Sequence, residues 1–294
     1  MDLGELLNVL QVRSEGGDCF LGHSPAERLR PVYGGQFLGQ ALLAAAATVE
    51  AGRLPHSLHA YFVRSGAAAT PIRYRVERVR DGRNLSHRSV VAEQDGREVF
   101  RQLLSFQVPT EGLSYQERIA VAPGTDPAGF GGYRDWVAEL SNDEGHPWFS
   151  EQVPVDIRLE HAPPPRPRRG ITEPLRIWMR CTEAVPSDDP VLHAALLAWM
   201  SDKTISDVTM YPHGRSWTDA ETDVLSLDHT MWFYEPSRAD QWTLLTHETA
   251  ATGGGRGLAR GDMANLQGRR IGAVAQEALL VVPTAPTARP PGER

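Results

Sequence analysis

Two spacing patterns of apolar residues follow one another in the first part of the chain. In residues 34–50, apolar side chains recur at helical spacing, as at Leu38, Leu42 and Ala45, and this predicts a buried helix. The runs that come next have the composition and alternation of strands: residues 57–64, 72–80, 87–94 and 99–107. Asp95-Gly96, between the last two runs, is a strong hairpin signal. The first half therefore predicts one long helix followed by an antiparallel sheet.

The second half of the chain repeats this order. A strand is predicted at residues 175–181, and Pro190 can begin a helix that runs to about residue 201. Further strands are predicted at residues 224–234, 242–249, 256–264 and 270–280. The hairpin sequence recurs as well, because Gln94-Asp95-Gly96-Arg97 is matched by Leu266-Gln267-Gly268-Arg269 before the last long strand of each half. The repeat indicates two copies of one small fold.

A single helix wrapped by an antiparallel sheet is the hotdog arrangement, and two such halves can pair their sheets edge to edge. The predicted fold class is therefore α+β, a double hotdog. Residues 1–110 are predicted to form the first hotdog, residues 111–150 a linker, and residues 151–282 the second hotdog. Some helix is expected near residues 136–140, a first strand of the second half at 155–159, and a stiff, exposed connection at the prolines and arginines of residues 163–169. The proline-rich residues 283–294 predict a disordered tail.

Composition and charge restrict the classes of partner and site. The chain has 294 residues, 41% hydrophobic and 23% charged, with a formal net charge of −7. A nucleic-acid partner is not favoured, since phosphate binding needs a concentrated basic face. Cys19 and Cys181 lie far apart and form no metal-ligand spacing, so no metal or cofactor is predicted and a reducing, cytoplasmic compartment is expected. The sequence predicts no signal peptide and no membrane span.

Asp202 is the first candidate for chemistry. It extends the apolar stripe of the second predicted helix, lying three residues after Trp199 and seven after Ala195, and it therefore faces the core side. A carboxylate there lies either just past the helix end in solvent or partly buried in a site. Burial would raise its pKa and make it a candidate for deprotonating water. The stripe of the first helix continues to Thr48 and carries no acid, so one active site per chain is expected, in the second hotdog.

The strands supply possible partners for this carboxylate. Along residues 224–233, alternation places Ser226, Asp228 and Thr230 on one face, and the Ser226 hydroxyl can both donate and accept hydrogen bonds. Gln276 lies in an otherwise apolar strand, where its amide must be paired. It either makes a structural hydrogen bond or orients a water or a substrate carbonyl.

Two other polar features are ambiguous from the sequence. Asp228 and His229 are adjacent in a predicted strand and point to opposite faces, so they cannot act as a simple dyad and are predicted to be structural. His56 and His59, at the start of a strand in the first half, are more readily explained as structural groups than as catalysts.

Several segments, in the same order over nearly the whole chain, resemble the acyl-CoA thioesterase II family, the TesB-like double-hotdog enzymes. They include Val32-Tyr33-Gly34-Gly35-Gln36, Gly39-Gln40-Ala41, the run from His56 to Phe62, Arg80-Asp81-Gly82-Arg83, the run from Ser226 to Phe233, Arg238-Ala239-Asp240-Gln241-Trp242, and Arg256-Gly257 through Gln276-Glu277. The resemblance implies hydrolysis of fatty acyl-CoA to free fatty acid and coenzyme A.

The resemblance also implies a catalytic set of Asp, Thr or Ser, and Gln. By motif position these fall on Asp202, Ser226 and Gln276, the residues that the spacing arguments also select. His56 matches a family position linked to activity and is predicted to bind substrate. The segment 203–207 is more polar than the family pattern, which bears on substrate preference.

The hypothesis for mechanism is direct attack of water on the thioester. Asp202 would accept the proton of the water, while Ser226 and Gln276 would hold it. Backbone N–H groups near Gly34 and Gly35 could stabilise the oxyanion. The alternatives are a non-catalytic acyl-CoA-binding protein and, on fewer grounds, a double-hotdog enoyl-CoA hydratase. A homo-oligomer, either a dimer or a tetramer of double-hotdog chains, is expected.

Overall fold

The computed structural model describes residues 1–24, 31–140, 153–163, 170–216, 219 and 222–282. Its helices are α1 (Leu3–Leu10), α2 (Gly34–Ala46), α3 (Tyr133–Leu140) and α5 (Pro190–Ser201), with 3-10 segments η1 (Pro127–Gly129) and η2 (Ile205–His213). The strands of the first half are β1 (Val12–Gly16), β2 (Cys19–Gly22), β3 (Leu54–Phe62), β4 (Ile72–Asp81), β5 (Leu85–Gln94) and β6 (Arg97–Gln107). Those that follow are β7 (Gly131–Gly132), β8 (Val155–Leu159), β9 (Leu175–Cys181), β10 (Asp223–Ser226), β11 (Asp228–Phe233), β12 (Thr243–Gly253), β13 (Arg256–Asn265) and β14 (Arg270–Val281).

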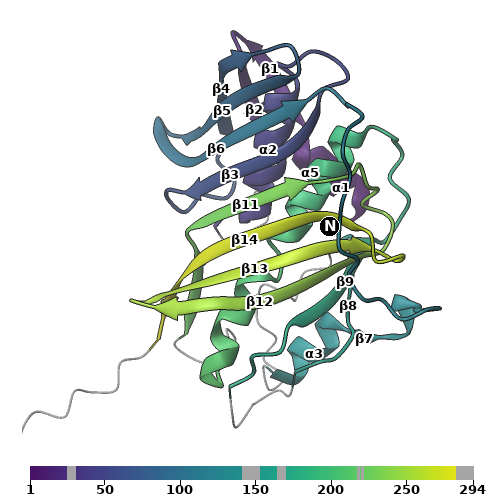
Figure 1. Ribbon diagram of the computed structural model, residues 1–294. Coiled ribbons are helices and arrows are strands. Elements are labelled where there is room, and N and C mark those ends of the chain that lie inside the picture. Colours follow the sequence, from purple (N-terminus) through teal and green to yellow (C-terminus); the bar gives the residue numbers. More distant parts are fainter. Residues whose placement is uncertain (25–30, 141–152, 164–169, 217–218, 220–221, 283–294) are drawn as a thin grey trace, which may run out of the picture.

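All described strands belong to one antiparallel sheet, in the order β1-β2-β4-β5-β6-β3-β11-β14-β13-β12-β9-β8-β7, with β10 paired to β14. The two halves meet where β3 pairs with β11, with Leu58 opposite Met231. Figure 1 shows the strands of the first half in one part of this sheet and those of the second half in the other, with α2 and α5 on the same side of it. This is the double hotdog that the repeated pattern predicted.

The pairings of the central strands correspond between the two halves. In the first half, the strand after the helix, β3, pairs with the last strand, β6. In the second half, β11 likewise follows α5 and pairs with the last strand, β14. The predicted Asp95-Gly96 hairpin joins β5 to β6, and both residues have positive φ, as a tight two-residue turn requires. The β13–β14 connection holds the matching Gly268, also at positive φ.

The central helices α2 and α5 pack against each other through small residues. A Cβ atom on Gly35 would lie 2.5 Å from the Trp199 carbonyl oxygen, and one on Gly39 would lie 3.2 Å from the Ala195 carbonyl oxygen. The Tyr33 hydroxyl adds a hydrogen bond of 2.8 Å to the Trp199 carbonyl oxygen. The N-terminus of α2 is therefore fixed next to the C-terminus of α5, where Asp202 follows.

Among the boundaries that differ from the sequence pattern, two lie next to the predicted site residues or the central helices. The helix predicted over 34–50 ends at Ala46, and the continuous strand predicted over 224–234 is broken at Leu227 into β10 and β11. At the break, the Leu227 N–H donates to the Glu277 carbonyl oxygen and the Leu227 carbonyl accepts from Phe62, both at 2.9 Å. These partners are distant in sequence, so the local alternation gave no sign of the break.

Elements outside the predicted repeats complete the fold. Helix α1, which the apolar spacing did not reveal, begins with a capping box between Asp2 and Glu5. The segment predicted as a linker, 111–150, contains β7 and α3, and β7 pairs with β8 of the second half. The predicted tail (283–294) and residues 164–169 of the predicted stiff connection lie outside the described residues. Within the described chain, no helix combines the length and apolar character that crossing a membrane would need.

Candidate active site

The structure brings the three predicted residues Asp202, Ser226 and Gln276 together. The Gln276 amide nitrogen donates a hydrogen bond of 2.7 Å to the Ser226 hydroxyl oxygen. The same side chain favours the charged form of the Asp202 carboxyl through a hydrogen-bonding contribution. Asp202 and Ser226 both line one cavity of about 470 Å³. Helix α5, strand β10 and strand β14 thus each supply one polar group to one place.

Asp202 is positioned by the way α5 begins and ends. The helix starts at Pro190, where the Asp189 carboxylate caps it by accepting from the Val191 N–H at 2.9 Å. It ends at Ser201, and Asp202 follows with φ −79° and ψ −6°. This backbone remains helical, so the Asp202 side chain continues the buried stripe, as its spacing from Trp199 predicted.

Burial is the dominant influence on the Asp202 carboxyl. It raises the pKa of Asp202 to about 7, against opposing contributions from the Gly35 backbone, the Gln276 side chain and the charge of Lys203. Among the described residues, its buried Oδ1 oxygen has no hydrogen-bond partner. A buried acceptor without a partner is costly unless a ligand or water fills the place. This oxygen is therefore open to accept a proton.

The predicted glycines lie directly at this carboxylate. A Cβ atom on Gly34 would be 2.7 Å from the Asp202 Oδ2 atom and 2.8 Å from the Phe62 ring. The residue before the helix, Tyr33, makes no side-chain cap hydrogen bond. The first N–H groups of α2 are thus not occupied by that residue, and the positive end of the helix lies beside the carboxylate. Only glycine permits this close approach.

His229 belongs to the same cluster, although the strand pattern predicted a structural role for it. Its Nδ1 hydrogen-bonds to the Gln276 side-chain oxygen, its Nε2 lies 3.0 Å from the Ser201 hydroxyl, and its Nδ1 lies 3.8 Å from Asp202 Oδ1. Burial lowers the pKa of His229 to about 4, so the ring is neutral at pH 7. A neutral ring that donates from Nδ1 fixes the Gln276 amide with its NH₂ group toward Ser226.

The break at Leu227 explains why alternation misplaced these side chains. A continuous strand would put Ser226 and Asp228 on one face and His229 on the other. With the break, Ser226 and His229 both bond to Gln276, while the Asp228 carboxylate accepts from the Glu277 backbone N–H at 2.7 Å. The Asp228 carboxylate thus bonds to the backbone of the neighbouring strand, and its structural role stays a prediction. A signal for His229 was available, since it is a polar residue in an apolar strand, as Gln276 is.

The cavity has mostly apolar walls. They are formed by Pro31, Val32, Phe37, Phe62, Val224, Leu225, Leu227 and Leu279. Its polar lining includes Arg64, Lys203 and Asp207. Such a space suits an apolar chain that ends in a polar group near Asp202.

The polar segment that follows Asp202 takes part in this lining. The ammonium of Lys203 lies 4.9 Å from the centroid of the Tyr33 ring, a cation–π distance. The Tyr133 hydroxyl of α3 donates to the Asp207 carboxylate. Burial raises the pKa of Asp207 to about 7, and the Asp202 charge adds to that rise. The segment noted in the sequence for its polarity therefore places a second carboxylate near the first.

His56 lies elsewhere. Its Nε2 is 2.7 Å from the Ser105 hydroxyl, and it lines a separate cavity that contains neither Asp202 nor Ser226. The structure therefore does not bring His56 to the carboxylate.

In the first half, the positions that correspond to the cluster hold different side chains. The irregular position is His56 in β3 and Leu227 in the second half. Pro55 therefore corresponds to Ser226, and Leu58 corresponds to His229. Leu104, which pairs with Leu58, corresponds to Gln276. After α2, Thr48 accepts a hydrogen bond of 2.8 Å from the buried Arg88 guanidinium. None of these residues is an acid that could serve as Asp202 does.

No group of three or more His, Cys, Asp or Glu side chains is arranged to hold a metal ion in the part of the chain that the structure describes.

Comparisons with known proteins give matches to acyl-CoA thioesterases. Residues 24–107 match the family model of the acyl-CoA thioesterase N-terminal domain, and residues 124–280 match that of the C-terminal domain. Human acyl-coenzyme A thioesterase 8 is 32% identical over 286 residues, covering 93% of this chain and 88% of the relative. The crystal structure of the acyl-CoA thioesterase II TesB2 from Mycobacterium marinum has a TM-score of 0.76 and 33% identity, covering 94% of this chain and 98% of that chain. A conserved protein with a hot dog fold from Alicyclobacillus acidocaldarius has a TM-score of 0.74 at 20% identity, covering 94% and 98%, and supports the fold alone.

Proposed function

Because this chain belongs to the acyl-CoA thioesterase family, we propose that Asp202, Ser226 and Gln276 carry out its hydrolysis of acyl-CoA to free fatty acid and coenzyme A. The observation that carries this assignment is the buried Asp202 Oδ1, which has no partner among the described residues and belongs to a carboxylate that lines the same cavity as Ser226. A general base works best when its pKa lies near the working pH, and burial gives Asp202 a pKa of about 7.

The first step is attack by water on the thioester carbonyl carbon. The water oxygen forms the new C–O bond as one water proton passes to Asp202 Oδ1. Gln276 donates to the Ser226 oxygen at 2.7 Å, so the Ser226 hydroxyl hydrogen is directed to the water or to the substrate oxygen. The N–H groups at the start of α2, beside Gly34 and Gly35, stabilise the oxyanion.

The second step breaks the C–S bond. The tetrahedral intermediate collapses to the carboxylic acid, and the proton held by Asp202 passes to the departing thiolate, which leaves as the coenzyme A thiol. Ser226 does not act as a nucleophile in this mechanism, because among the residues that the structure describes no histidine is hydrogen-bonded to its oxygen as a base. His229 reaches it only through Gln276.

The cavity favours a substrate with an apolar acyl chain. Its apolar wall residues come from both halves, with Phe37 and Phe62 from the first and Val224 and Leu279 from the second. The polar groups Lys203 and Asp207 interrupt this lining, and they set the preference among acyl groups. Neither the non-catalytic binding protein nor the enoyl-CoA hydratase is favoured by the family match.

The decisive experiment is an assay of thiol release from acetyl-, octanoyl- and palmitoyl-CoA by the wild-type protein and by Asp202→Asn. The wild type releases thiol and the variant loses nearly all activity on the preferred substrate. Equal rates for the two proteins, or an acyl group trapped on Ser226 and found by mass spectrometry, would refute the mechanism.

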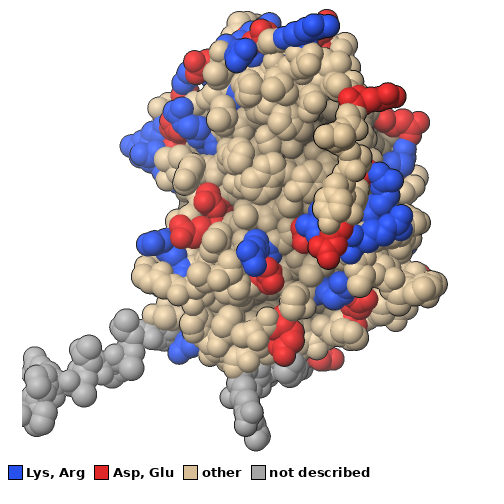
Figure 2. Space-filling view, viewed as in Figure 1, with Lys and Arg blue, Asp and Glu red and all other residues tan. Residues whose placement is uncertain are grey.

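The assembly is a homo-oligomer, a dimer or a tetramer. Its support is the outer face of the sheet near the β3–β11 junction, where Tyr61 is 64% exposed and Leu103 and Trp232 are also exposed. Figure 2 shows that the middle of this face carries few charged side chains. Sedimentation of the wild type beside Trp232→Arg tests this surface, because a monomeric wild type would exclude the homo-oligomer.

The two cysteines are both free, which supports a reducing, cytoplasmic location, to be tested by cell fractionation.

A further inference from the structure

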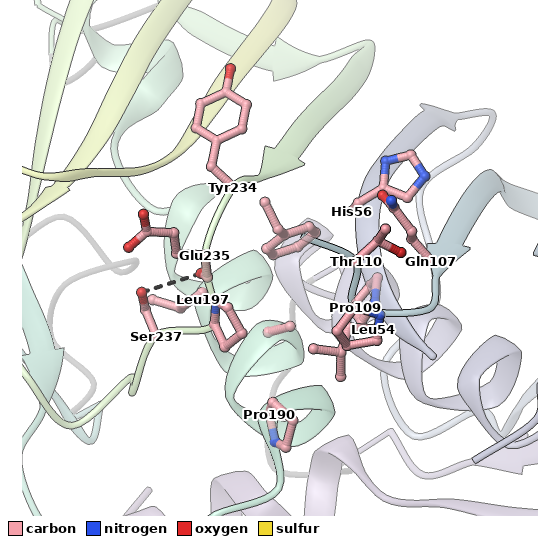
Figure 3. Close-up of a pocket in the computed structure, with 14 residues that line it drawn as sticks. Leu54, His56, Gln107, Pro109, Thr110, Pro190, Leu197, Tyr234, Glu235 and Ser237 are labelled. Carbon is pink, nitrogen blue, oxygen red and sulfur yellow. Dashed lines mark hydrogen bonds between the residues drawn. The ribbon is translucent and has the colours of Figure 1, made fainter. Parts of the chain in front are cut away.

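A second cavity, of about 290 Å³, lies between the two halves around His56. Figure 3 shows His56, Gln107 and Leu54 of the first half on one side of it, facing Tyr234, Glu235 and Ser237 of the second half. Pro190 of helix α5 lies below them in the same view, and Leu197 of the same helix also lines the cavity. None of its lining residues lines the Asp202 cavity.

This His56 cavity is built from the same parts of the repeat as the Asp202 cavity. Leu54 pairs with Gln107 in the first half, as Leu225 pairs with Leu279 in the second, and each pair lines its own cavity. The last residue of each central strand also lines a cavity. Phe233, at the end of β11, lines the His56 cavity, and Phe62, at the end of β3, lines the Asp202 cavity. The first residue of a central helix completes each set, Pro190 of α5 here and Gly34 of α2 at the Asp202 cavity.

The residues proposed for hydrolysis are replaced around the His56 cavity. Pro55 occupies the position of Ser226, and Leu104 that of Gln276. The end of α2 is occupied by the Arg88 guanidinium, which donates to the Thr48 carbonyl oxygen at 3.0 Å and pairs with Asp81 at 2.8 Å. The cavity therefore lacks counterparts of Asp202, Ser226 and Gln276. The Glu235 carboxylate, which also lines it, is paired with the Arg269 guanidinium.

What remains is suited to an apolar chain with one polar end. Leu54, Pro55, Leu197 and Phe233 supply apolar surface, and His56 presents an imidazole whose Nε2 is already engaged by Ser105 at 2.7 Å. An engaged Nε2 holds the ring in one orientation, so its other nitrogen can bond a polar group of a ligand. The volume of about 290 Å³ lies just below the roughly 300–1,000 Å³ usual for small-molecule sites, so only a short chain segment fits.

We infer that the His56 cavity is a second, non-hydrolytic binding site for the acyl chain of a fatty acid or an acyl thioester. The inference rests on the proposed function, because the acyl ligand is carried over from the Asp202 cavity through the repeat. In this view, the segment around His56, which resembles thioesterases in sequence, binds a ligand at a place separate from the Asp202 carboxylate.

The test is photolabelling of the Asp202→Asn protein, which retains its ligand. Two diazirine probes are used: a medium-chain fatty acid and the thioether analogue of the same acyl-CoA. Labelled peptides are mapped by mass spectrometry. We expect labels in two separate sets of segments, residues 31–37 and 222–227 for the Asp202 cavity, and residues 54–56, 107–110 and 233–237 for the His56 cavity. The probe that labels the second set identifies free acid or thioester as the source of the chain.

Bulky substitutions that fill the His56 cavity supply the control. Ala194→Phe narrows it from helix α5, and Thr110→Trp closes it from the exposed loop after β6 should the helix variant fail to fold. Each lowers labelling of the second set by about tenfold or more and leaves the first set labelled. Glu111→Trp, next to Thr110 and outside the lining, leaves both sets labelled.

Two outcomes separate the inference from the function on which it rests. Labels confined to the Asp202 segments, or labels near His56 that survive both filling variants, overturn the second site and leave the proposed function standing. Labels near His56 that the filling variants remove, together with a wild-type protein that releases no thiol, support the second site and contradict the proposed function.

Discussion

The Gln276 amide nitrogen donates a hydrogen bond of 2.7 Å to the Ser226 hydroxyl oxygen. This contact joins the last strand of the second half to the residue directly before the break at Leu227. Through the other end of the Gln276 amide it continues to the buried, neutral His229 ring. The predictions below follow from this cluster and from the Asp202 carboxylate beside it.

Asp202→Asn removes the proposed base while keeping the shape of the side chain. We expect kcat/KM for the preferred acyl-CoA to fall by about 10²- to 10⁴-fold, the range typical of general-base removal. Asp223→Asn is the matched control, since Asp223 lines the same cavity and is exposed at the first residue of β10. If Asp223→Asn lost as much activity as Asp202→Asn, the result would contradict the assignment of Asp202 as the base.

The pH profile of kcat/KM follows from the raised pKa of Asp202. The base must be ionised to accept a proton, so activity rises as pH increases through about 7 and then levels off. Asp207 has a pKa raised to a similar value, so the midpoint belongs to the interacting pair.

The raised pKa of Asp202 also makes the stability of the protein depend on pH. The contribution of Asp202 to the free energy of unfolding is largest below its usual pKa of about 3.9 and is lost as pH rises through the folded value of about 7. Denaturant unfolding from pH 4 to 8 should therefore show a smaller loss for Asp202→Asn than for the wild type.

Lys203 stabilises the charged form of Asp202. Lys203→Met is therefore expected to move the midpoint of the kcat/KM profile to higher pH. Lys203→Arg keeps the charge and serves as the control, with a midpoint close to that of the wild type. A Lys203→Met midpoint at or below the wild-type value would show that this charge does not act on the base.

His229 and Gln276 can be tested as a pair against their counterparts Leu58 and Leu104. Either His229→Leu or Gln276→Leu alone leaves a buried polar partner without its hydrogen bond and should destabilise the protein by about 1–3 kcal/mol. The double variant removes both polar groups, so its free energy of unfolding should fall by less than the sum of the two single losses. Equilibrium unfolding in urea gives the three values, and strict additivity would argue against the pairing. All three variants are expected to lose activity.

Gly35 allows α2 and α5 to approach, and any side chain there must separate them. Gly35→Ala places a Cβ atom 2.5 Å from the Trp199 carbonyl oxygen, and overpacking of this kind costs about 1–3 kcal/mol. The N-terminus of α2 would move away from Asp202, so kcat should fall as well. Gly129→Ala is the control, because a Cβ atom there meets no atom within 4 Å. Thermal unfolding and thiol release measure both effects.

The sequence by itself determined the repeated architecture and indicated the candidate site residues. Helix α5, strand β9 and the Asp95-Gly96 hairpin follow from local spacing and turn chemistry, which depend on neighbours within a few residues. The spacing of Asp202 from Trp199 placed it in line with the apolar stripe, but it left open whether the carboxylate lies in solvent past the helix end or partly buried in a site. The resemblance to thioesterases then implied that Ser226 and Gln276 belong to one catalytic set with Asp202.

Only the tertiary structure decided how these residues meet. The break at Leu227 depends on pairing with Phe62 and Glu277, which are far away in the chain, and it turned His229 toward Gln276 against the alternation of a regular strand. The approach of Gly35 to Trp199 and the place of His56 in a separate cavity likewise depend on contacts between the halves. Local spacing fixes which way a side chain faces along its own element, whereas hydrogen bonding and packing between distant segments fix what it faces.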